Sequence, residues 1–223
     1  IHMNRVLRLK TNDDIIVCFN DGYDNFAKIT QCEKNFAKAE IYVSQINKNE
    51  PTLDITLFQA LIKGEKEDLL IQKAVELGVN EIYPFESENC TVKIKEGEKK
   101  SERLNKIAQE AAKQCKRAKI THIHPFITFK ELLNKLKNFS VVIFASELEE
   151  KNSLIQYLNS VVPLKNVALI IGSEGGFTQN EHKALTESKA YPITMGNRIL
   201  RAETAGIALI SAITFYCGEW EKR

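Results

Sequence analysis

From about residue 52 onward, short apolar segments alternate with segments of helical periodicity, and this alternation constrains the fold more than any other feature of the chain. Segments such as "LDITLF", "EIYPF", "VVIFA" and "VALII" have the length of buried strands. Strands that are nearly continuous apolar runs and alternate with helices are typical of parallel sheets that are buried on both faces. We therefore predict an α/β fold in which a mostly parallel sheet carries helices on both faces.

Helical segments lie between these strands and follow the last of them. One helix is predicted over Glu65–Leu77 and ended by Gly78, and a longer one over Ser101–Lys119. The stretch Ala205–Ile213 is apolar or small on every side except at Ser211, so it is no ordinary surface helix. Two explanations stay open for it, a central core helix and an oligomer interface.

The first part of the chain, residues 1–51, has a different pattern. It is rich in strand-forming segments such as "IIVCF" and "FAKAEIYVSQI", with a turn at Asn20–Gly22 and a polar linker at Asn47–Pro51. We predict a small barrel or curled sheet here, followed by a second domain over residues 52–223. The chain does not begin with Met, which suggests that an N-terminal piece is missing.

Composition excludes several classes of protein. A hydrophobic content of 43% argues against a mostly disordered chain, and no apolar run approaches the roughly 18 residues that span a membrane. The first ten residues lack the apolar core of a secretory signal. The five cysteines are widely spaced without a C-x-x-C pair, so we expect neither a disulfide framework nor a zinc site, and a reducing, cytoplasmic setting. A net charge of +2 is too small to indicate nucleic-acid binding by itself.

Three late strands end in polar or glycine-bearing segments, Ala145–Glu147, Gly172–Phe177 and Gly196–Glu203. The carboxyl ends of parallel strands share one edge of a sheet, so these segments are expected to converge on one ligand. Glycines that merely permit tight turns are the alternative. Thr178 and Glu181 form a capping box that opens a helix directly after the second segment.

The segment "GSEGGF" matches no known phosphate-binding loop, since it lacks both the Walker pattern and G-x-G-x-x-G. Glu174 would repel a phosphate, and no lysine is expected beside it to offset that charge. Ser173 is no hydrolase nucleophile, because the G-x-S-x-G pattern would need Gly at Ile171. A small uncharged or cationic ligand suits this loop better.

Four ordered segments carry a family resemblance: "KGEKEDLLIQKAVELGVNEIYPF", "AAKQCKRAKI", "IGSEGGFTQNE" and "MGNRILRAETAGIALISAI". They resemble the ribosomal RNA small-subunit methyltransferase E family, over nearly the whole chain. The resemblance implies a SPOUT-type parallel sheet with a C-terminal trefoil knot, preceded by a small PUA-like β-barrel domain that binds RNA. It also implies S-adenosylmethionine as cofactor and methylation of uridine N3 in 16S ribosomal RNA of the small subunit. Ser173, Asn197 and Lys113 depart from the family's usual Pro, Pro and Glu.

The methyl donor of this family lies against the knot, which corresponds to the three converging segments. A sulfonium with an amino-acid tail has no phosphate, so Glu174 need not repel it. The residues that the resemblance assigns to the cofactor are Ala145, Ser146, Glu147, Ile171, Gly172, Glu174, Gly175, Gly176, Met195, Gly196, Ile199, Leu200, Ala202 and Thr204.

Methylation at N3 requires loss of the ring proton and leaves negative charge on the flanking carbonyl oxygens. Arginine suits the second task because its fork of donors can hold an oxyanion, and Arg201 is the first candidate and Arg198 the second. A phosphate or helix-end contact is the alternative for both. Glu174 is a candidate to accept the proton or to fix Arg201, unless it only caps backbone N–H groups of the turn. The three histidines at 122, 124 and 182 lie outside the converging segments and are interpreted as surface or packing residues.

Two groups of basic residues are candidates for RNA contact, although a solvated basic face is the alternative for each. One follows the helix predicted from Ser101, and the other belongs to the N-terminal domain. The first group consists of Arg103, Lys106, Lys113, Lys116 and Arg117, and the second of Arg5, Arg8 and Lys10. No metal site is predicted.

The sequence also predicts an oligomeric state, and two alternative functions remain to be weighed. The apolar character of the last helix, about Glu203 to Tyr216, predicts a homodimer with this helix and its Ile210 in the interface. A non-catalytic RNA-binding or ribosome-associated protein with the same fold is one alternative function. A nucleotide-binding α/β enzyme is another, which the absent phosphate loops disfavour.

Overall fold

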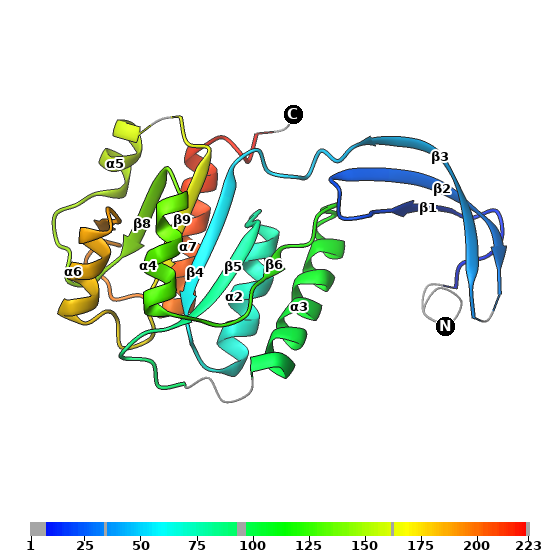
Figure 1. Ribbon diagram of the computed structural model, residues 1–223. Coiled ribbons are helices and arrows are strands. Elements are labelled where there is room, and N and C mark those ends of the chain that lie inside the picture. Colours follow the sequence, from blue (N-terminus) through cyan, green and yellow to red (C-terminus); the bar gives the residue numbers. More distant parts are fainter. Residues whose placement is uncertain (1–7, 34, 93–96, 162, 222–223) are drawn as a thin grey trace. The chain divides into compact units, whose positions relative to one another are not determined.

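The computed structural model describes residues 8–33, 35–92, 97–161 and 163–221 (Figure 1). The chain forms two compact units, one made of Ile1–Glu50 with Lys113–Lys119 and the other of Pro51–Ala112 with Ile120–Arg223. The return of residues 113–119 to the first unit was not part of the prediction of two consecutive domains. No helix in the described ranges is long and apolar enough to cross a membrane.

The first unit contains a three-stranded antiparallel sheet with the order β1-β2-β3. The strands are β1 (Asp14–Val17), β2 (Tyr23–Cys32) and β3 (Ala37–Ile46). Asn20 and Gly22, with φ of 64° and 90°, form the turn between β1 and β2. The described residues show a sheet, and its closure into a barrel stays a prediction.

The second unit contains a seven-stranded sheet, in which every strand pair is parallel. The strand order is β10-β8-β9-β4-β5-β6, and β7 also pairs with β5. The strands are β4 (Asp54–Ala60), β5 (Glu81–Glu86), β6 (His122–Ile123), β7 (Ile127–Thr128), β8 (Val141–Ala145), β9 (Asn166–Ile171) and β10 (Tyr191–Ile193). The predicted parallel sheet is confirmed.

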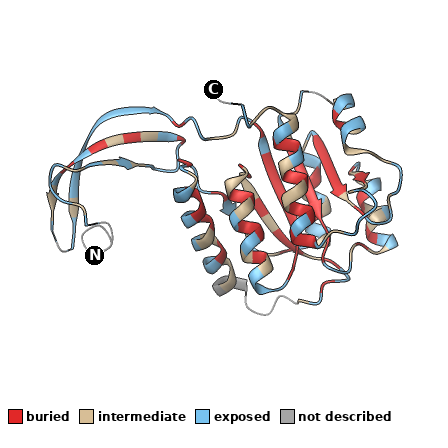
Figure 2. Ribbon diagram, turned by 180° about the vertical axis from the view of Figure 1, so that it is seen from behind, coloured by how far each residue is buried: buried red, intermediate tan, exposed pale blue. Residues whose placement is uncertain are grey.

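Helices cover both faces of this sheet, with α2 and α7 on one face and α4 on the other (Figures 1 and 2). The helices are α2 (Gly64–Glu76), α3 (Gly97–Gln114), α4 (Phe129–Lys135) with the 3₁₀ turn η1 (Leu136–Asn138), α5 (Leu154–Val161), α6 (Gln179–Glu187) and α7 (Ala202–Tyr216). On the α4 face the fully buried rings of Phe58, Phe85 and Phe144 pack with Leu132 and Leu185. Each such side chain contributes roughly 1.5–3 kcal/mol of hydrophobic stabilisation.

The helix ends follow local sequence signals in most places. Gly78, with φ of 91°, follows the end of α2, as predicted. The capping box of Thr178 and Glu181 that opens α6 is also confirmed. The predicted end of the longer helix at Lys119 was wrong, because α3 ends at Gln114 and Lys116 adopts a left-handed φ of 61°.

The apolar helix α7 is a core element along one face. Its Leu209, Ile210 and Ile213 are completely buried within a single chain. The placement of Ile210 in an intermolecular interface was therefore wrong, because packing within the chain already uses its whole surface. The opposite face of α7 carries the exposed Ala212 and Phe215. Gly206 lets the helix lie close to α2, since a Cβ there would be 2.8 Å from Cδ1 of Leu70.

Candidate functional site

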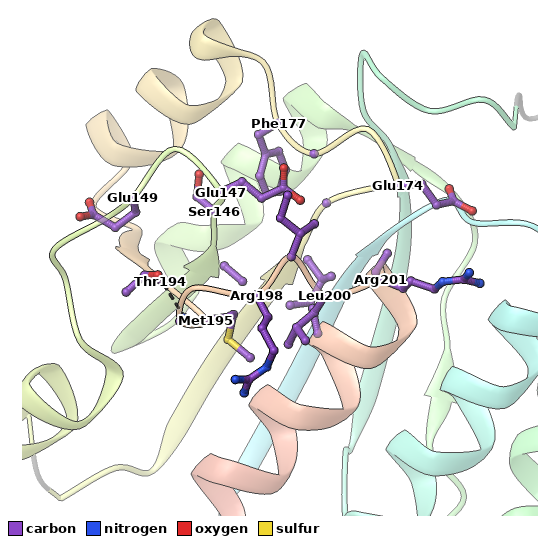
Figure 3. A pocket seen from close by; sticks show the side chains of 18 of the residues that line it. Ser146, Glu147, Glu149, Glu174, Phe177, Thr194, Met195, Arg198, Leu200 and Arg201 are labelled. Carbon is purple, nitrogen blue, oxygen red and sulfur yellow. Dashed lines mark hydrogen bonds between the residues drawn. The ribbon is translucent and has the colours of Figure 1, made fainter.

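The carboxyl ends of β8, β9 and β10 lie level at one edge of the sheet. Ala145 pairs with Ile171 on one side and with Ile193 on the other. Each strand then leads into one of the three segments that were predicted to converge. Figure 3 shows the side chains that these segments contribute around a shared pocket.

The segment after β9 is a tight turn closed by its own backbone. The N–H of Gly176 donates to the carbonyl of Ser173 at 3.0 Å, and Gly176 has a φ of 63°. A Cβ on Gly172 would lie 3.4 Å from the carbonyl carbon of Gly176, so the two glycines allow the turn to fold back on itself. Phe177 then anchors the turn in the core, edge-on to the ring of Phe144 at 5.9 Å.

A neighbouring loop fixes the outer side of this turn. The side-chain amide of Asn89 donates to the carbonyl of Gly175 at 2.9 Å. A Cβ on Gly175 would lie 2.9 Å from that of Asn89, which leaves no room for another residue type without movement. From the sheet side, the buried amide of Gln59 donates to the carbonyl of Gly172 at 3.4 Å. The turn is held from both sides.

The segment after β10 runs from Thr194 to the start of α7. The N–H of Gly196 donates to Oγ1 of Thr194 at 3.2 Å, and Gly196 has a φ of 88°. No atom of the described residues lies within 4 Å of the position that a Cβ would take there. The segment after β8 is joined to the end of β10, because the N–H of Ser146 donates to the carbonyl of Ile193 at 3.1 Å.

These segments enclose a pocket of about 670 Å³, within the size range of small-molecule sites. Its lining residues are Ala145, Ser146, Glu147, Glu149, Glu150, Ile171, Gly172, Ser173, Glu174, Gly176, Phe177, Thr194, Met195, Gly196, Asn197, Arg198, Ile199, Leu200, Arg201, Ala202 and Ala205. All three candidate catalytic residues and most residues assigned to the cofactor are among them. Gly175 and Thr204 are not, because the Gly175 carbonyl is turned to Asn89 and Thr204 lies on the exposed side of α7.

Several lining residues were missed by sequence reasoning. Ser173, Phe177, Thr194, Asn197 and Ala205 lie within or beside the segments already singled out, so their position was the available signal. Glu149 and Glu150 belong to no motif, and only the bend of the chain after β8 brings them to the pocket.

The charge of the lining favours a cationic ligand. The lining contains four carboxylates and two guanidinium groups, so it carries two more negative than positive side chains. The carboxylates belong to Glu147, Glu149, Glu150 and Glu174, and the guanidinium groups to Arg198 and Arg201. The pKa of Glu149 lies below its ordinary value, because backbone N–H groups donate hydrogen bonds to its carboxylate. The N–H of Lys151 has the larger effect and the N–H of Asn152 the next.

Ser173 adds an unused hydrogen-bonding group to this lining. Its side chain is buried, and its Oγ contacts no hydrogen-bond partner among the described residues. A buried hydroxyl without a partner costs about 1–3 kcal/mol, so a partner brought by a ligand or a water would remove that cost.

Two of the three candidate catalytic side chains share a direction, and the third does not. Glu174 and Arg201 extend toward the same side in Figure 3, away from Met195, whereas Arg198 extends along α7. Glu174 contacts Lys66 of α2, with 3.5 Å between Nζ and Oε1. The inference that no lysine accompanies Glu174 was therefore wrong, because the fold brings this one from 108 residues earlier in the chain.

The basic residues proposed for RNA contact fall into different environments. Arg8, Lys10, Lys106, Lys113 and Lys116 are exposed. Arg103 is exposed but pairs with Asp68 and lies 3.8 Å from Glu67. Arg5 lies outside the described residues.

Arg117 does not fit the predicted role of a surface contact. Its guanidinium is buried and lies 3.1 Å from a carboxylate oxygen of Glu50. A buried arginine paired in this way holds the first unit together and is not available to a phosphate.

The histidines make ring contacts outside the pocket. His182 lies edge-on to Phe144 with 5.0 Å between ring centres, and His124 stacks on Tyr83 at 3.7 Å. Burial is the main cause that lowers the pKa of His124, and the nearby His122 lowers it further. No group of three or more His, Cys, Asp and Glu side chains in the described part of the chain could hold a metal ion.

Comparison with known proteins identifies the family. The RNA methyltransferase domain model matches residues 48–214. The ribosomal RNA small subunit methyltransferases E of Bacillus subtilis (strain 168) and Mesomycoplasma hyopneumoniae (strain 232) are 31% and 35% identical, covering 96% and 94% of this chain and 86% and 89% of their own lengths. The crystal structure of the Neisseria gonorrhoeae protein of that name, bound to S-adenosyl methionine, has a TM-score of 0.86 and 32% identity, over 96% of this chain and 88% of its own. The chain therefore belongs to the RNA methyltransferase domain family and, within it, to the ribosomal RNA small subunit methyltransferase E proteins.

Proposed function

We propose that this protein transfers a methyl group from S-adenosylmethionine to N3 of a specific uridine in the 16S ribosomal RNA of the small subunit. The observation that carries the proposal is the pocket at the level ends of β8, β9 and β10. A relative that shares this fold was crystallised with S-adenosyl methionine, and the curated relatives are named as methyltransferases of small-subunit ribosomal RNA.

The pocket suits the cofactor in size and charge. Its excess of carboxylates complements the positive sulfonium and amino groups, and the open space at the Cβ position of Gly196 leaves room for a ligand beside the backbone there. The unused hydroxyl of Ser173 provides one more polar contact. S-adenosylmethionine, once bound, supplies a methyl group on a positively charged sulfur that a nucleophilic nitrogen can take.

The residues on the open side then act on the uridine. In this proposal Glu174 accepts the N3 proton, and Arg201 donates hydrogen bonds to the flanking carbonyl oxygens as they gain negative charge. The position of both residues in the pocket lining supports these roles. The guanidinium of Arg201 makes no ion pair or hydrogen bond with another side chain in the described ranges, so its donors are available. Arg198 is a second candidate for the same task, since its guanidinium has no such partner there either.

The wider assembly belongs to the same proposal. The first unit acts as a PUA-like RNA-binding domain, and the exposed lysines of α3 bind phosphates. Two chains associate through the exposed side of α7, and the last strand and helix form the trefoil knot of SPOUT methyltransferases. The enzyme works in the cytoplasm, where ribosomal subunits assemble.

The test is to incubate the protein with labelled S-adenosylmethionine and small subunits that lack this methylation, and then to map the modified base. Label at N3 of one uridine is expected. A protein whose melting temperature rises with the cofactor but which transfers no label would instead be a binding protein. Label in another base or in a ribose would refute the uridine-N3 assignment.

A further inference from the structure

Lys66 stands apart from the other basic residues, because it contacts a pocket-lining residue, Glu174, from an element far away in sequence. It lies in the first turn of α2, which begins shortly after the carboxyl end of β4. Because β4 pairs with β9, the start of α2 reaches the edge of the sheet from which the Gly172–Phe177 turn emerges. Its Nζ lies 3.5 Å from Oε1 of Glu174.

This ion pair contributes little to the stability of the fold. The two side chains keep 34% and 28% of their accessible surface, and the separation is long for a charge-assisted hydrogen bond. Exposed pairs of this kind have small effects on the free energy of unfolding. Its position beside the pocket therefore calls for another explanation.

Two basic side chains bear on Glu174, namely Arg201, which lines the same pocket, and Lys66, with which it forms an ion pair. Glu174 and Arg201 line the same pocket and extend to the same side of it, yet the ion pair that forms is with Lys66 (Figure 3). An arginine and a carboxylate on one pocket wall would readily form a two-point ion pair, which would occupy the donors that an oxyanion needs.

We propose that Lys66 is a positioning residue for methyl transfer, which holds the Glu174 carboxylate at the α2 side of the pocket and so keeps the Arg201 guanidinium available for the uridine carbonyl oxygens. This inference rests on the proposed function. It assigns to Lys66 a role that acts through Glu174, without contact to the cofactor or the reacting atoms.

The first experiment measures the state of Arg201 and needs no turnover. Parent, Lys66→Met and Lys66→Met/Glu174→Gln proteins are treated with an arginine-selective dicarbonyl reagent, and the modification of Arg201 is followed by peptide mass spectrometry, with Arg198 as internal reference. Arg201 should react readily in the parent, several-fold more slowly in Lys66→Met, and readily again in the double variant, which has no carboxylate to pair with it. Equal reactivity in parent and Lys66→Met would overturn the proposal.

The second experiment measures single-turnover methylation at saturating RNA and cofactor. Lys66→Met should slow transfer on the order of tenfold or more, because a paired arginine stabilises the transition state less. Cofactor affinity by calorimetry should stay unchanged, and Lys66→Arg should restore most of the rate. If Glu174→Gln is itself slow, the Lys66 substitution should add little to that defect.

A matched control comes from the same helix. Lys73 pairs with Glu76 at 2.9 Å, and their side chains keep 38% and 27% of their accessible surface, but this pair lies outside the pocket. Lys73→Met should leave both the rate and the reactivity of Arg201 unchanged. A Lys66→Met protein whose only change is weaker RNA binding with a smaller salt dependence would mean that Lys66 contacts a phosphate, which contradicts the proposal. Failure of the parent itself to methylate RNA would refute the proposed function and leave the reactivity experiment decisive for Lys66.

Discussion

Arg201 occupies a position from which its backbone and its side chain are proposed to serve cofactor binding and methyl transfer, respectively. It is the N-cap residue of α7, with an extended backbone at φ −64° and ψ 152°, and its side chain takes no part in capping the helix. The backbone before it lines the pocket, while its exposed guanidinium extends away from Met195 (Figure 3). Backbone and side chain can therefore act on different partners.

Arg201→Ala should bind S-adenosylmethionine within about threefold of the parent yet transfer the methyl group on the order of 10²- to 10³-fold more slowly, the usual cost of losing one oxyanion donor. Arg201→Lys should recover little, since an ammonium lacks the fork of donors. Calorimetry beside single-turnover kinetics provides the measurement. Near-normal turnover in the alanine variant would remove Arg201 from the chemistry.

Individual pocket residues differ in how far the sequence could reveal them. Met195, Gly196 and Ser146 were predictable because each follows a recognisable buried strand, and parallel strands bring their ends together. Lys66 was not predictable, because its contact with Glu174 depends on strand order, which placed β4 beside β9. The prediction that Arg117 contacts RNA was wrong, since helical spacing cannot distinguish an exposed cation from one buried against Glu50.

The helix α3 carries the exposed lysines that are proposed to position RNA. Lys106→Gln with Lys113→Gln should weaken RNA binding and reduce the slope of log affinity against log salt by about 0.7 to 0.9 for each lost phosphate contact. Cofactor binding should not change. Lys130→Gln with Lys183→Gln, which removes the same charge from the exposed sides of α4 and α6, is the control. An unchanged slope in the α3 variant would mean that these lysines only face solvent.

The contact between α2 and α3 contains a buried acid, Glu67, which is paired with Lys100 at 2.9 Å. Burial raises the pKa of Glu67 above its ordinary value of 4.5, and the lysine offsets this only in part. A raised folded-state pKa means that the stabilising contribution is fully present below the ordinary value and is lost as the pH rises through the folded value.

Glu67→Gln should therefore be no less stable than the parent at pH 7, and its relative advantage should vanish as the pH falls below about 4.5. Urea unfolding at pH 7 and at pH 4 measures the difference. A glutamine variant that is less stable at pH 7 by more than about 1 kcal/mol would show that the ion pair outweighs the cost of burial.

The ends of elements were predictable where a residue type sets them. Gly78 after α2 and Thr178 before α6 are such cases, because a left-handed backbone and a capping hydroxyl are properties of single residues. The end of α3 was not, since Lys116 adopts a left-handed backbone without a glycine or asparagine to announce it. Its carbonyl accepts hydrogen bonds from the side chains of Asn47 and Asn49, contacts that arise only in the folded chain.

Assembly of two chains is expected to use the exposed side of α7. Phe215 keeps 66% of its accessible surface and contacts the ring of Trp220, which is 58% exposed, at 5.5 Å between centres. Such neighbouring exposed aromatic side chains are typical of protein–protein interfaces.

Phe215→Glu should convert the dimer to a monomer in sedimentation experiments at micromolar concentration, because it places a charge in the interface core. The free energy of unfolding of the monomer should change by no more than about 0.5 kcal/mol, since the side chain is exposed. Leu69→Glu, on the exposed side of α2, should leave assembly unaffected. A parent protein that is already monomeric would refute the dimer.

The order of the strands in the sheet also determines how long a strand stays unpaired while the chain is being synthesised. β4 lies at the centre of the sheet beside β9, and Asn166, the partner of Asp54, follows it by 112 residues. At the usual elongation rate of 5–20 residues per second, β4 waits roughly 6 to 22 seconds for this partner. Throughout that interval an apolar strand presents an open edge to other nascent chains. Newly made protein should therefore depend on chaperones at high expression, whereas the finished sheet buries that edge at its centre.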